Sequence, residues 1–452
     1  MTMNIQNATG FDVELAARAL DRATEAREGA FSLEDRRTAS AILRELAFPT
    51  REHELWRRTD FRALEAELPK LDPFVTSPAA RNVDDLPHPI LERLAGETGE
   101  VAIVVQRNSS VVLEQTHPAL TKQGVVVGSI ERGFREQESL LRERFGALIH
   151  PDYDWYTAFG ATVRSGGAFI YVPDGVEAAI PIRLFHWIDA AGTIAAPRTV
   201  VVLGKNSRAT IVEELLSAPV TGTSFHLGGT EVFVGEGAHL TYGQLQDWGR
   251  NVVHYSNQRV RLDRDAEVQW IQTLLGSRMV KTNAYFDMAG PGARAFVHGF
   301  MFGDHDQHFH LHTLQRHQKD HCTSDLLIKG CLKDTARSIY QGLIQVSEGA
   351  QRTDAYQANR NLLLSDTARA DSIPGLEILA NDVRCTHGAT IGNHRQRGPR
   401  ADALPDGARP AALPGAAPDR GGILHAGARP HPARERARTA ARRDRPEDRV
   451  IA

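Results

Sequence analysis

Short turn sequences with a small residue just before an expected strand recur along the second half of this chain, and they constrain its fold most. Seven of them read GKNSRAT, GEGAHL, DRDAEV, GPGARAF, KDTARSI, SEGAQRT and SDTARAD. Their alanines are Ala209, Ala238, Ala266, Ala293, Ala336, Ala350 and Ala368, at spacings of 29, 28, 27, 43, 14 and 18 residues. Most of these spacings lie near one or two multiples of roughly fourteen, and such a period indicates stacked rungs.

The runs between these turns are short and rich in Val and Ile, as β-strands are. Similar runs occur upstream, from Val101–Val105 to Thr210–Leu215, with one helix-like break at Arg135–Phe145. We therefore expect a mainly β protein in which residues 125–392 form a right-handed parallel β-helix. The alternative, an antiparallel sandwich, favours two-residue Asn-Gly hairpins, and the sequence contains no Asn-Gly pair.

The N-terminal part has a different pattern. Apolar residues recur three or four positions apart between Phe11 and about Phe48, which predicts an amphipathic helical hairpin. Asp72–Pro89 is rich in Pro, Asp and Asn and is typical of a surface linker. We interpret residues 1–124 as an N-terminal helical region and linker.

Composition and motifs exclude several function classes. No run of eighteen apolar residues predicts a membrane span. The first 392 residues carry 40 basic against 49 acidic side chains, which is a poor surface for nucleic acid. The phosphate-loop, dinucleotide, serine-hydrolase and HExxH motifs are absent. The chain is therefore not expected to hydrolyse ATP itself.

Cysteine usage indicates the compartment. The three cysteines, Cys322, Cys331 and Cys385, are odd in number and widely spaced, which argues against a disulfide framework and for a reducing environment. The first thirty residues show no secretory signal pattern. We expect the protein to be cytoplasmic.

Two groups of residues could bind metal. On a strand, Cys385 and His387 would share one face, and a thiolate with an imidazole suits iron–sulfur chemistry, zinc or copper. Two ligands do not complete a site, and the alternative is that Cys385 is a small inward-facing core residue. His308, His310 and His312 would also share one face, either as ligands of zinc or copper or as a solvated or partner-facing surface.

A catalytic alternative also exists. Asp354, Asp366, Asp371 and Asp382 lie in the repeat region, and a β-helix polysaccharide lyase or glycosidase could use such carboxylates. Aspartate is also common in turns for purely structural reasons. A metal-binding structural solenoid is the other alternative function.

One long stretch resembles a known family. Residues 321–392 read HCTSDLLIKGCLKDTARSIYQGLIQVSEGAQRTDAYQANRNLLLSDTARADSIPGLEILANDVRCTHGATIG, and FPTREHELWRRTDFRAL lies near the start. Both are similar to the SufB/SufD iron–sulfur cluster assembly scaffolds, and CTHGATIG looks like the SufD branch. The resemblance covers most of residues 10–392.

The resemblance implies a fold and a set of partners. It implies N-terminal helices, a β-helix core, and a C-terminal helical region that docks the ABC-type ATPase SufC. It also implies pairing with a SufB-like chain through the last rungs of the two β-helices, a homodimer when the chain is alone, and room for a flavin in the assembled complex.

The resemblance also implies a non-catalytic role. His387 matches the SufD histidine at the SufB interface, and Cys385 matches its neighbour, so both would face a transient iron–sulfur cluster. If these two residues lie at i and i+2 on a strand, we expect a twist or bulge to bring His387 to the subunit boundary.

The tail departs from the family. Residues 393–452 contain 13 Arg, no Lys, no aromatic residue and eight prolines, which do not allow the helices that the resemblance implies. We interpret this segment as a disordered Arg/Ala/Pro-rich tail or as the product of a reading-frame shift near Gly392.

Overall fold

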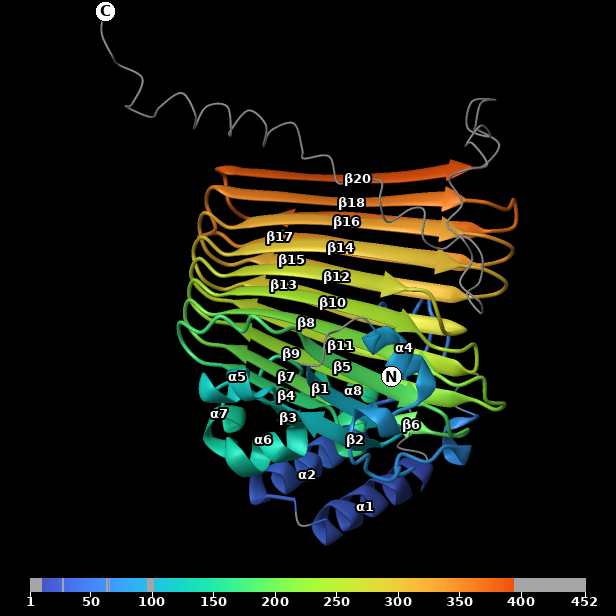
Figure 1. Cartoon of the computed structure of the whole chain (residues 1–452). Helices are drawn as coiled ribbons and strands as arrows, with labels where there is room; N and C mark the ends of the chain where they lie inside the picture. Colours follow the sequence, from blue (N-terminus) through green and yellow to red (C-terminus); the bar gives the residue numbers. More distant parts are fainter. Residues whose placement is uncertain (1–9, 27, 62–63, 65, 96–100, 394–452) are drawn as a thin grey trace, which may run out of the picture. The chain divides into compact units, whose positions relative to one another are not determined.

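Two long parallel sheets form the body of the protein and face each other across a single core. The computed structural model describes residues 10–26, 28–61, 64, 66–95 and 101–393. The predicted Arg/Ala/Pro-rich tail lies, from residue 394 on, outside the described residues. From β7 on, successive strands alternate between the two sheets, so the chain coils upward as a solenoid (Figure 1).

The first sheet has the order β2-β1-β5-β8-β10-β12-β14-β16-β18-β20 and is parallel except for the β1–β2 pair. Its strands are β1 (Ala102–Arg107), β2 (Ser110–Gln115), β5 (Ile182–Ile188), β8 (Arg208–Ser217), β10 (His239–Asp247), β12 (Glu267–Leu274), β14 (Arg294–Gly303), β16 (Thr323–Leu332), β18 (Thr353–Leu363) and β20 (Val383–Asn393).

The second sheet has the order β19-β17-β15-β13-β11-β9-β7-β4-β3, and the short β6 pairs with β9. Its strands are β3 (Val126–Ser129), β4 (Ala168–Val172), β6 (Ile194–Ala195), β7 (Arg198–Leu203), β9 (Ser224–Val234), β11 (Val252–Leu262), β13 (Met279–Met288), β15 (His308–His317), β17 (Arg337–Val346) and β19 (Arg369–Ile378).

The predicted β-helix is therefore confirmed, and the sandwich alternative is wrong. Parallel crossovers are right-handed in nearly all known sheets, and that sense stays our expectation for this coil. The division at residues 124 and 125 also stays a prediction; β1, which precedes it, already pairs in parallel with β5.

The fourteen-residue period is half a turn of the coil. Glu267 pairs with His239 below and Arg294 above, so a full turn takes 28 and then 27 residues here. Each turn has two corners, one before each sheet. Ala266 and Ala293 stand at the corner before the first sheet, whereas Ala336 stands at the corner before the second, which explains the spacing of 43.

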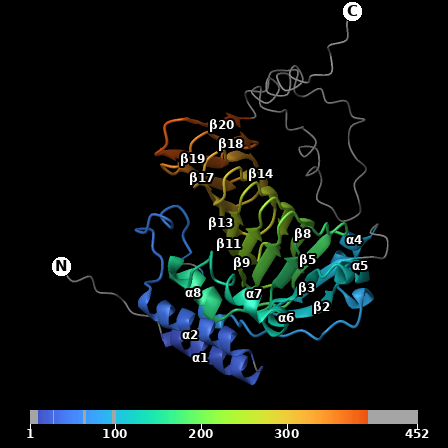
Figure 2. The ribbon, with the colours of Figure 1, turned by 90° about the vertical axis from the view of Figure 1, so that its left-hand side faces the viewer.

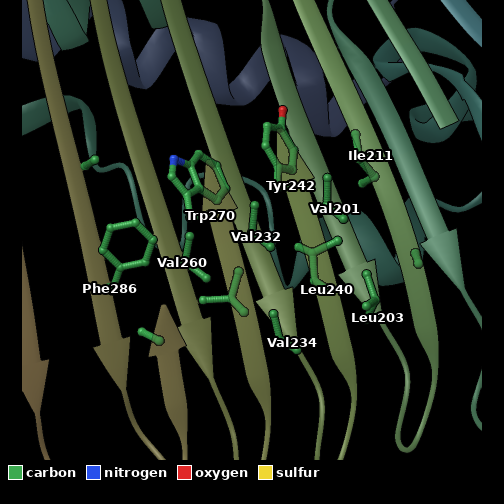
Figure 3. Packing of buried hydrophobic residues seen from close by; sticks show 14 of the residues in the cluster. Val201, Leu203, Ile211, Val232, Val234, Leu240, Tyr242, Val260, Trp270 and Phe286 are labelled. Carbon is green, nitrogen blue, oxygen red and sulfur yellow. The ribbon is translucent and has the colours of Figure 1, made fainter. Parts of the chain in front are cut away.

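Inward side chains of both sheets interdigitate to form the solenoid core (Figure 3). Tyr242 and Trp270, on neighbouring strands, stack with ring centroids 4.3 Å apart, and neither side chain is exposed. Val232, Val260 and Phe286 of the second sheet pack against them. Burial of each such side chain stabilises the fold by about 1.5–3 kcal/mol.

Short helices surround the first turns of the solenoid. The α-helices are α1 (Gly10–Glu25), α2 (Ala30–Glu45), α4 (His88–Leu94), α5 (Pro118–Lys122), α6 (Ile130–Glu136), α7 (Glu138–Arg142) and α8 (Trp155–Thr162), and the 3₁₀ helices are η1 (Leu68–Lys70), η2 (Val83–Asp85) and η3 (Pro151–Tyr153). The predicted N-terminal helical hairpin is α1 and α2, and α2 packs on α8 (Figure 2). None of the described helices is long and apolar enough to cross a membrane.

A buried ion cluster fastens α2 to the solenoid. Arg36 donates hydrogen bonds to Glu28 and to the carbonyl oxygens of Thr162 and Arg164, and the Arg164 guanidinium also contacts Glu28. Burial alone would raise the pKa of Glu28, but the hydrogen bond and charge of Arg36 and the charge of Arg164 lower it to about 2. The carboxylate therefore stays ionised and paired at neutral pH.

Candidate functional site

The two sheets both stop at the C-terminal end of the solenoid. β20 is the last strand of the first sheet and β19 the last of the second, so each lacks an outer neighbour among the described residues. Their outer edges present unpaired backbone groups, which in proteins are templates for pairing with another chain. We call this surface, formed by β19 and β20, the open end (Figure 1).

Cys385 and His387 lie on the inward face of β20. In the register of β18 and β20, Cys385 pairs with Ala355 and His387 with Gln357, both of which are buried in the core. The β18–β20 ladder runs from Val383 to Asn393 without a register shift. The expected bulge is therefore wrong for this strand, which is the outermost of the first sheet among the described residues. That His387 lies at a subunit boundary stays a prediction.

The open end leaves part of the apolar core uncovered. Among the described residues, five large hydrophobic side chains are exposed, and four of them belong to the last turn. They are Leu376 (37% exposed), Ile378 (39%), Leu379 (62%) and Ile391 (47%), and the fifth is Ile271 (44%) in the middle of the first sheet. An apolar patch of this kind marks an interaction surface.

The sequence patterns did not single out these apolar residues. The signal that could have found them is that they fall in the final repeat. In earlier turns such positions are covered by the next rung, whereas β20 is the last strand among the described residues.

The two candidate ligands differ in environment. Cys385 is half-buried and packs, with Val383, against a small apolar cluster that contains Ile344 and Ala355. Burial, followed by the nearby charge of Asp354, raises the pKa of the Cys385 thiol to about 11. Because a thiol must lose its proton to bind metal, ligation here has to displace that proton. His387 is exposed.

Cys385 and His387 alone do not provide a complete set of metal ligands. The described residues contain no group of three His, Cys, Asp or Glu side chains placed to hold a metal ion. Cys322 and Cys331 are buried, and Cys322 donates its S–H to the carbonyl oxygen of Gly290 at a turn corner. Cys385 is thus the cysteine among the three that reaches the surface.

The histidine strand lies under a segment from the N-terminal region. His308, His310 and His312 share the outer face of β15, as predicted, but this face is covered by residues Phe48–Phe61, which we call the strap. The strap hydroxyl of Thr59 lies 2.6 Å from His310 Nδ1 and 3.3 Å from His308 Nε2. His310 is buried and His308 and His312 are half-buried, so the face is not freely solvated along its whole length. Metal binding by these histidines stays a prediction.

Burial keeps this covered face neutral. It lowers the pKa of His308 to about 4 and that of His312 to about 3, and it also lowers the pKa of His310. The neighbouring Lys281 ammonium lies 5.0 Å from the centre of the Trp56 ring in the strap, and burial lowers its pKa to about 7. The strap is thus packed on neutral imidazoles and on the Lys281 amine, whose lowered pKa leaves it only partly protonated at neutral pH.

The aspartates of the catalytic alternative are spread over the last turns. Asp371 forms an ion pair with Arg337 at 2.5 Å, and Asp382 lies 3.8 Å from Arg352. These two contacts are at corners and strand edges.

The solenoid interior also holds polar groups that the sequence patterns did not indicate. Glu213 accepts hydrogen bonds from Tyr242 and Gln244 and lies 3.0 Å from His186 Nε2. Burial tends to raise the pKa of Glu213, but these contacts lower it overall. Each of these partners occupies an inward-facing position on its strand. The alternation of side chains along a strand does not show which of its two faces points inward until the pairing of the strands is known.

Comparison with known proteins is consistent with this geometry. Residues 186–397 match the family model described as "SUF system FeS cluster assembly, SufBD core domain", and residues 97–184 match "SufBD protein N-terminal region". The two models together leave one residue between them unmatched.

Several curated proteins are similar to this chain. It is 25% identical over 289 residues to "Iron-sulfur cluster assembly protein SufB" of Bacillus subtilis, and 24% identical over 289 residues to an "Iron-sulfur cluster assembly SufBD family protein" of Staphylococcus haemolyticus. Each match covers 64% of this chain and 62% of the relative. A Staphylococcus aureus member of that family is 22% identical over 320 residues, or 69% of each chain.

The chain thus spans somewhat less than two thirds of the first two relatives. The two family models together match residues 97–184 and 186–397, which include the last turn with Cys385 and His387. The chain belongs to the SufBD family of iron–sulfur cluster assembly proteins.

Proposed function

We propose that this chain is a non-catalytic scaffold subunit of the SufD branch, which pairs through its open end with a SufB-like subunit. The proposal rests on the last turn of the solenoid, which no further strand covers among the described residues. There, exposed apolar side chains, unpaired strand edges and the pair Cys385 and His387 occur on one surface. The CTHGATIG sequence supports the SufD branch, which the named relatives do not distinguish from SufB.

The cluster is cargo in this account. An imidazole from His387 and, after loss of its proton, a thiolate from Cys385 would face the junction, and the partner subunit would supply the remaining ligands. Iron and sulfur would meet in that junction and leave as a finished cluster. The sequence has no phosphate loop, so ATP would be hydrolysed by a partner ATPase of the SufC type.

Further features of the proposal follow from the resemblance. Without a SufB-like partner, the same open end would pair with a second copy of this chain. A flavin, where present, would belong to the assembled complex. Cys322, Cys331 and Cys385 form no disulfide bond with one another, which supports a reducing compartment such as the cytoplasm.

Replacement of His387 tests the proposal. The full chain is co-expressed with its SufB-like and ATPase partners, and iron and sulfide are measured in the purified complex. His387→Ala should lower cluster content about tenfold while the complex stays assembled. His298→Ala, on the outer face of β14, is the matched control and should leave cluster content unchanged. Equal cluster content in the two variants would contradict the proposal.

A further inference from the structure

We propose that Gln357 is a positioning residue for His387, and that it acts through a buried row of hydrogen bonds one strand below the open end. The inference rests on the proposed function, because it explains how His387 is held for use at the junction. Gln357 is the register partner of His387 and is itself fully buried.

The row crosses the solenoid interior. The Thr313 hydroxyl lies 3.0 Å from the Tyr340 hydroxyl, which donates to Gln357 Oε1 at 3.3 Å. Gln357 Nε2 then donates to two carbonyl oxygens of the second sheet, Gly342 at 3.4 Å and Gly375 at 3.2 Å. One amide therefore connects β18 to both β17 and β19.

Gly342 leaves room for this row of hydrogen bonds. A Cβ atom on Gly342 would lie 2.6 Å from Gln357 Oε1 and would also collide with the Tyr340 hydroxyl, so no side chain fits at this position. Burial raises the pKa of Tyr340, which keeps the phenol protonated as a donor. Each group thus donates a hydrogen bond to the next one in the row, from the Thr313 hydroxyl through Tyr340 and Gln357 to the two carbonyl oxygens.

Residues that pair with one another across successive strands of the first sheet form a column in the core, and Gln357 belongs to the column that ends at His387. In this column the row of hydrogen bonds takes the place of apolar packing next to the open end. Below Gln357, the same inward column contains Leu326 and, one strand further down, Val297, and both are buried. Apolar contacts hold neighbouring strands together but do not fix direction, whereas hydrogen bonds do. A polar residue directly beneath His387 therefore sets the spacing and tilt of the last two sheet layers, on which β20 rests.

Gln357→Met is the variant that separates positioning from stability. Methionine nearly matches glutamine in length and volume, so it removes the three hydrogen bonds without leaving a cavity. Tyr340 keeps Thr313 as a partner. Val297→Ala, three strands below His387 in the same column, is the control, since it removes buried volume away from the row.

The first readout reports on His387 itself. The full chain, labelled with ¹⁵N-histidine, is compared in the presence of its SufB-like and ATPase partners, and the His387 imidazole signal is assigned by its loss in His387→Gln. Gln357→Met should shift or broaden this signal, and Val297→Ala should not. An unchanged His387 signal in Gln357→Met, or the same change in both variants, overturns the inference.

The second readout reports on the cargo and separates the two claims. In the co-expressed complex, Gln357→Met should lower cluster content about tenfold, as loss of a supporting residue behind a ligand commonly does. A normal cluster content despite a shifted His387 signal overturns the positioning role. If His387→Ala itself keeps the cluster, the proposed function fails, whereas the imidazole shift would still show that Gln357 orients His387.

Discussion

His387 is the register partner of Gln357 in the last turn, so the most exposed candidate ligand lies beside a buried amide that is hydrogen-bonded to Tyr340. The candidate ligand His387 therefore lies at the end of the core that no further described strand covers. In earlier turns the equivalent column is occupied by Tyr242, Trp270 and Leu326, all buried. The change from apolar to polar along one column marks the end at which the protein is expected to meet its partner.

The strap is expected to depend on Thr59. Thr59→Val keeps the shape of the side chain but removes the hydroxyl shared by His308 and His310, so that His310 Nδ1 keeps only Lys281 Nζ, at 3.4 Å, of these two neighbours. The free energy of unfolding should fall by about 0.5–1.5 kcal/mol, the net contribution of a typical hydrogen bond. Urea unfolding followed by circular dichroism measures this. Thr38→Val, on the exposed side of α2, is the matched control, and an equally small effect of both variants would show that the Thr59 contact is unimportant.

Acid is expected to destabilise the solenoid through its buried histidines. Burial lowers the pKa of both His254 and His317 to about 3, compared with the ordinary value of about 6.5. Between these values the unfolded chain binds more protons than the folded one, so stability is complete above pH 6.5 and is lost as the pH falls toward 3. Each histidine contributes up to about 1.4 kcal/mol per pH unit in this window.

Thermal unfolding at a series of pH values measures this loss. The melting temperature should fall steadily as the pH is lowered below 6.5. His317→Gln should reduce the slope, because one titrating group is removed while Ser324 keeps a hydrogen-bonding neighbour. A slope that is the same in the variant and the parent chain would show that His317 does not contribute.

The Cys385 thiol is expected to react slowly at neutral pH. Its pKa of about 11 leaves little thiolate at pH 7, and thiolate is the species that is alkylated. The rate of alkylation by iodoacetamide, followed by mass spectrometry of the full chain, should rise with pH up to about 11. Asp354→Asn should raise the rate at pH 8, because removal of a negative charge lowers the pKa of the thiol. A rate that levels off near pH 8 would contradict this environment.

Much of the fold could be predicted from the sequence because the repeat is local. A small residue at a corner, as at Ala238 or Ala266, and a short β-rich run are visible within a few residues. The period of fourteen does not by itself reveal that one turn has two corners. That distinction depends on which strands pair, as Glu267 pairs with His239, and pairing is a long-range property.

The candidate site was predicted in part for the same reason. The spacing of Cys385 and His387 correctly places them on one face of a strand. That β20 is the last strand, and that Gln357 and Tyr340 lie beneath it, follows from contacts between residues far apart in sequence. The covered face at His310 could not be predicted either, since Thr59 is some 250 positions away along the chain.

The central claim is that the open end is the surface that joins a SufB-like partner. Ile391 (47% exposed) and Ile271 (44% exposed) are two isoleucines of the first sheet with nearly equal exposure, but only Ile391 lies in the last turn. The most direct measurement is size-exclusion chromatography of the full chain co-expressed with its SufB-like partner, with either Ile391→Asp or Ile271→Asp. The account predicts that Ile391→Asp elutes without the partner while Ile271→Asp retains it. Retention of the partner by both variants, or its loss from Ile271→Asp alone, would contradict the account.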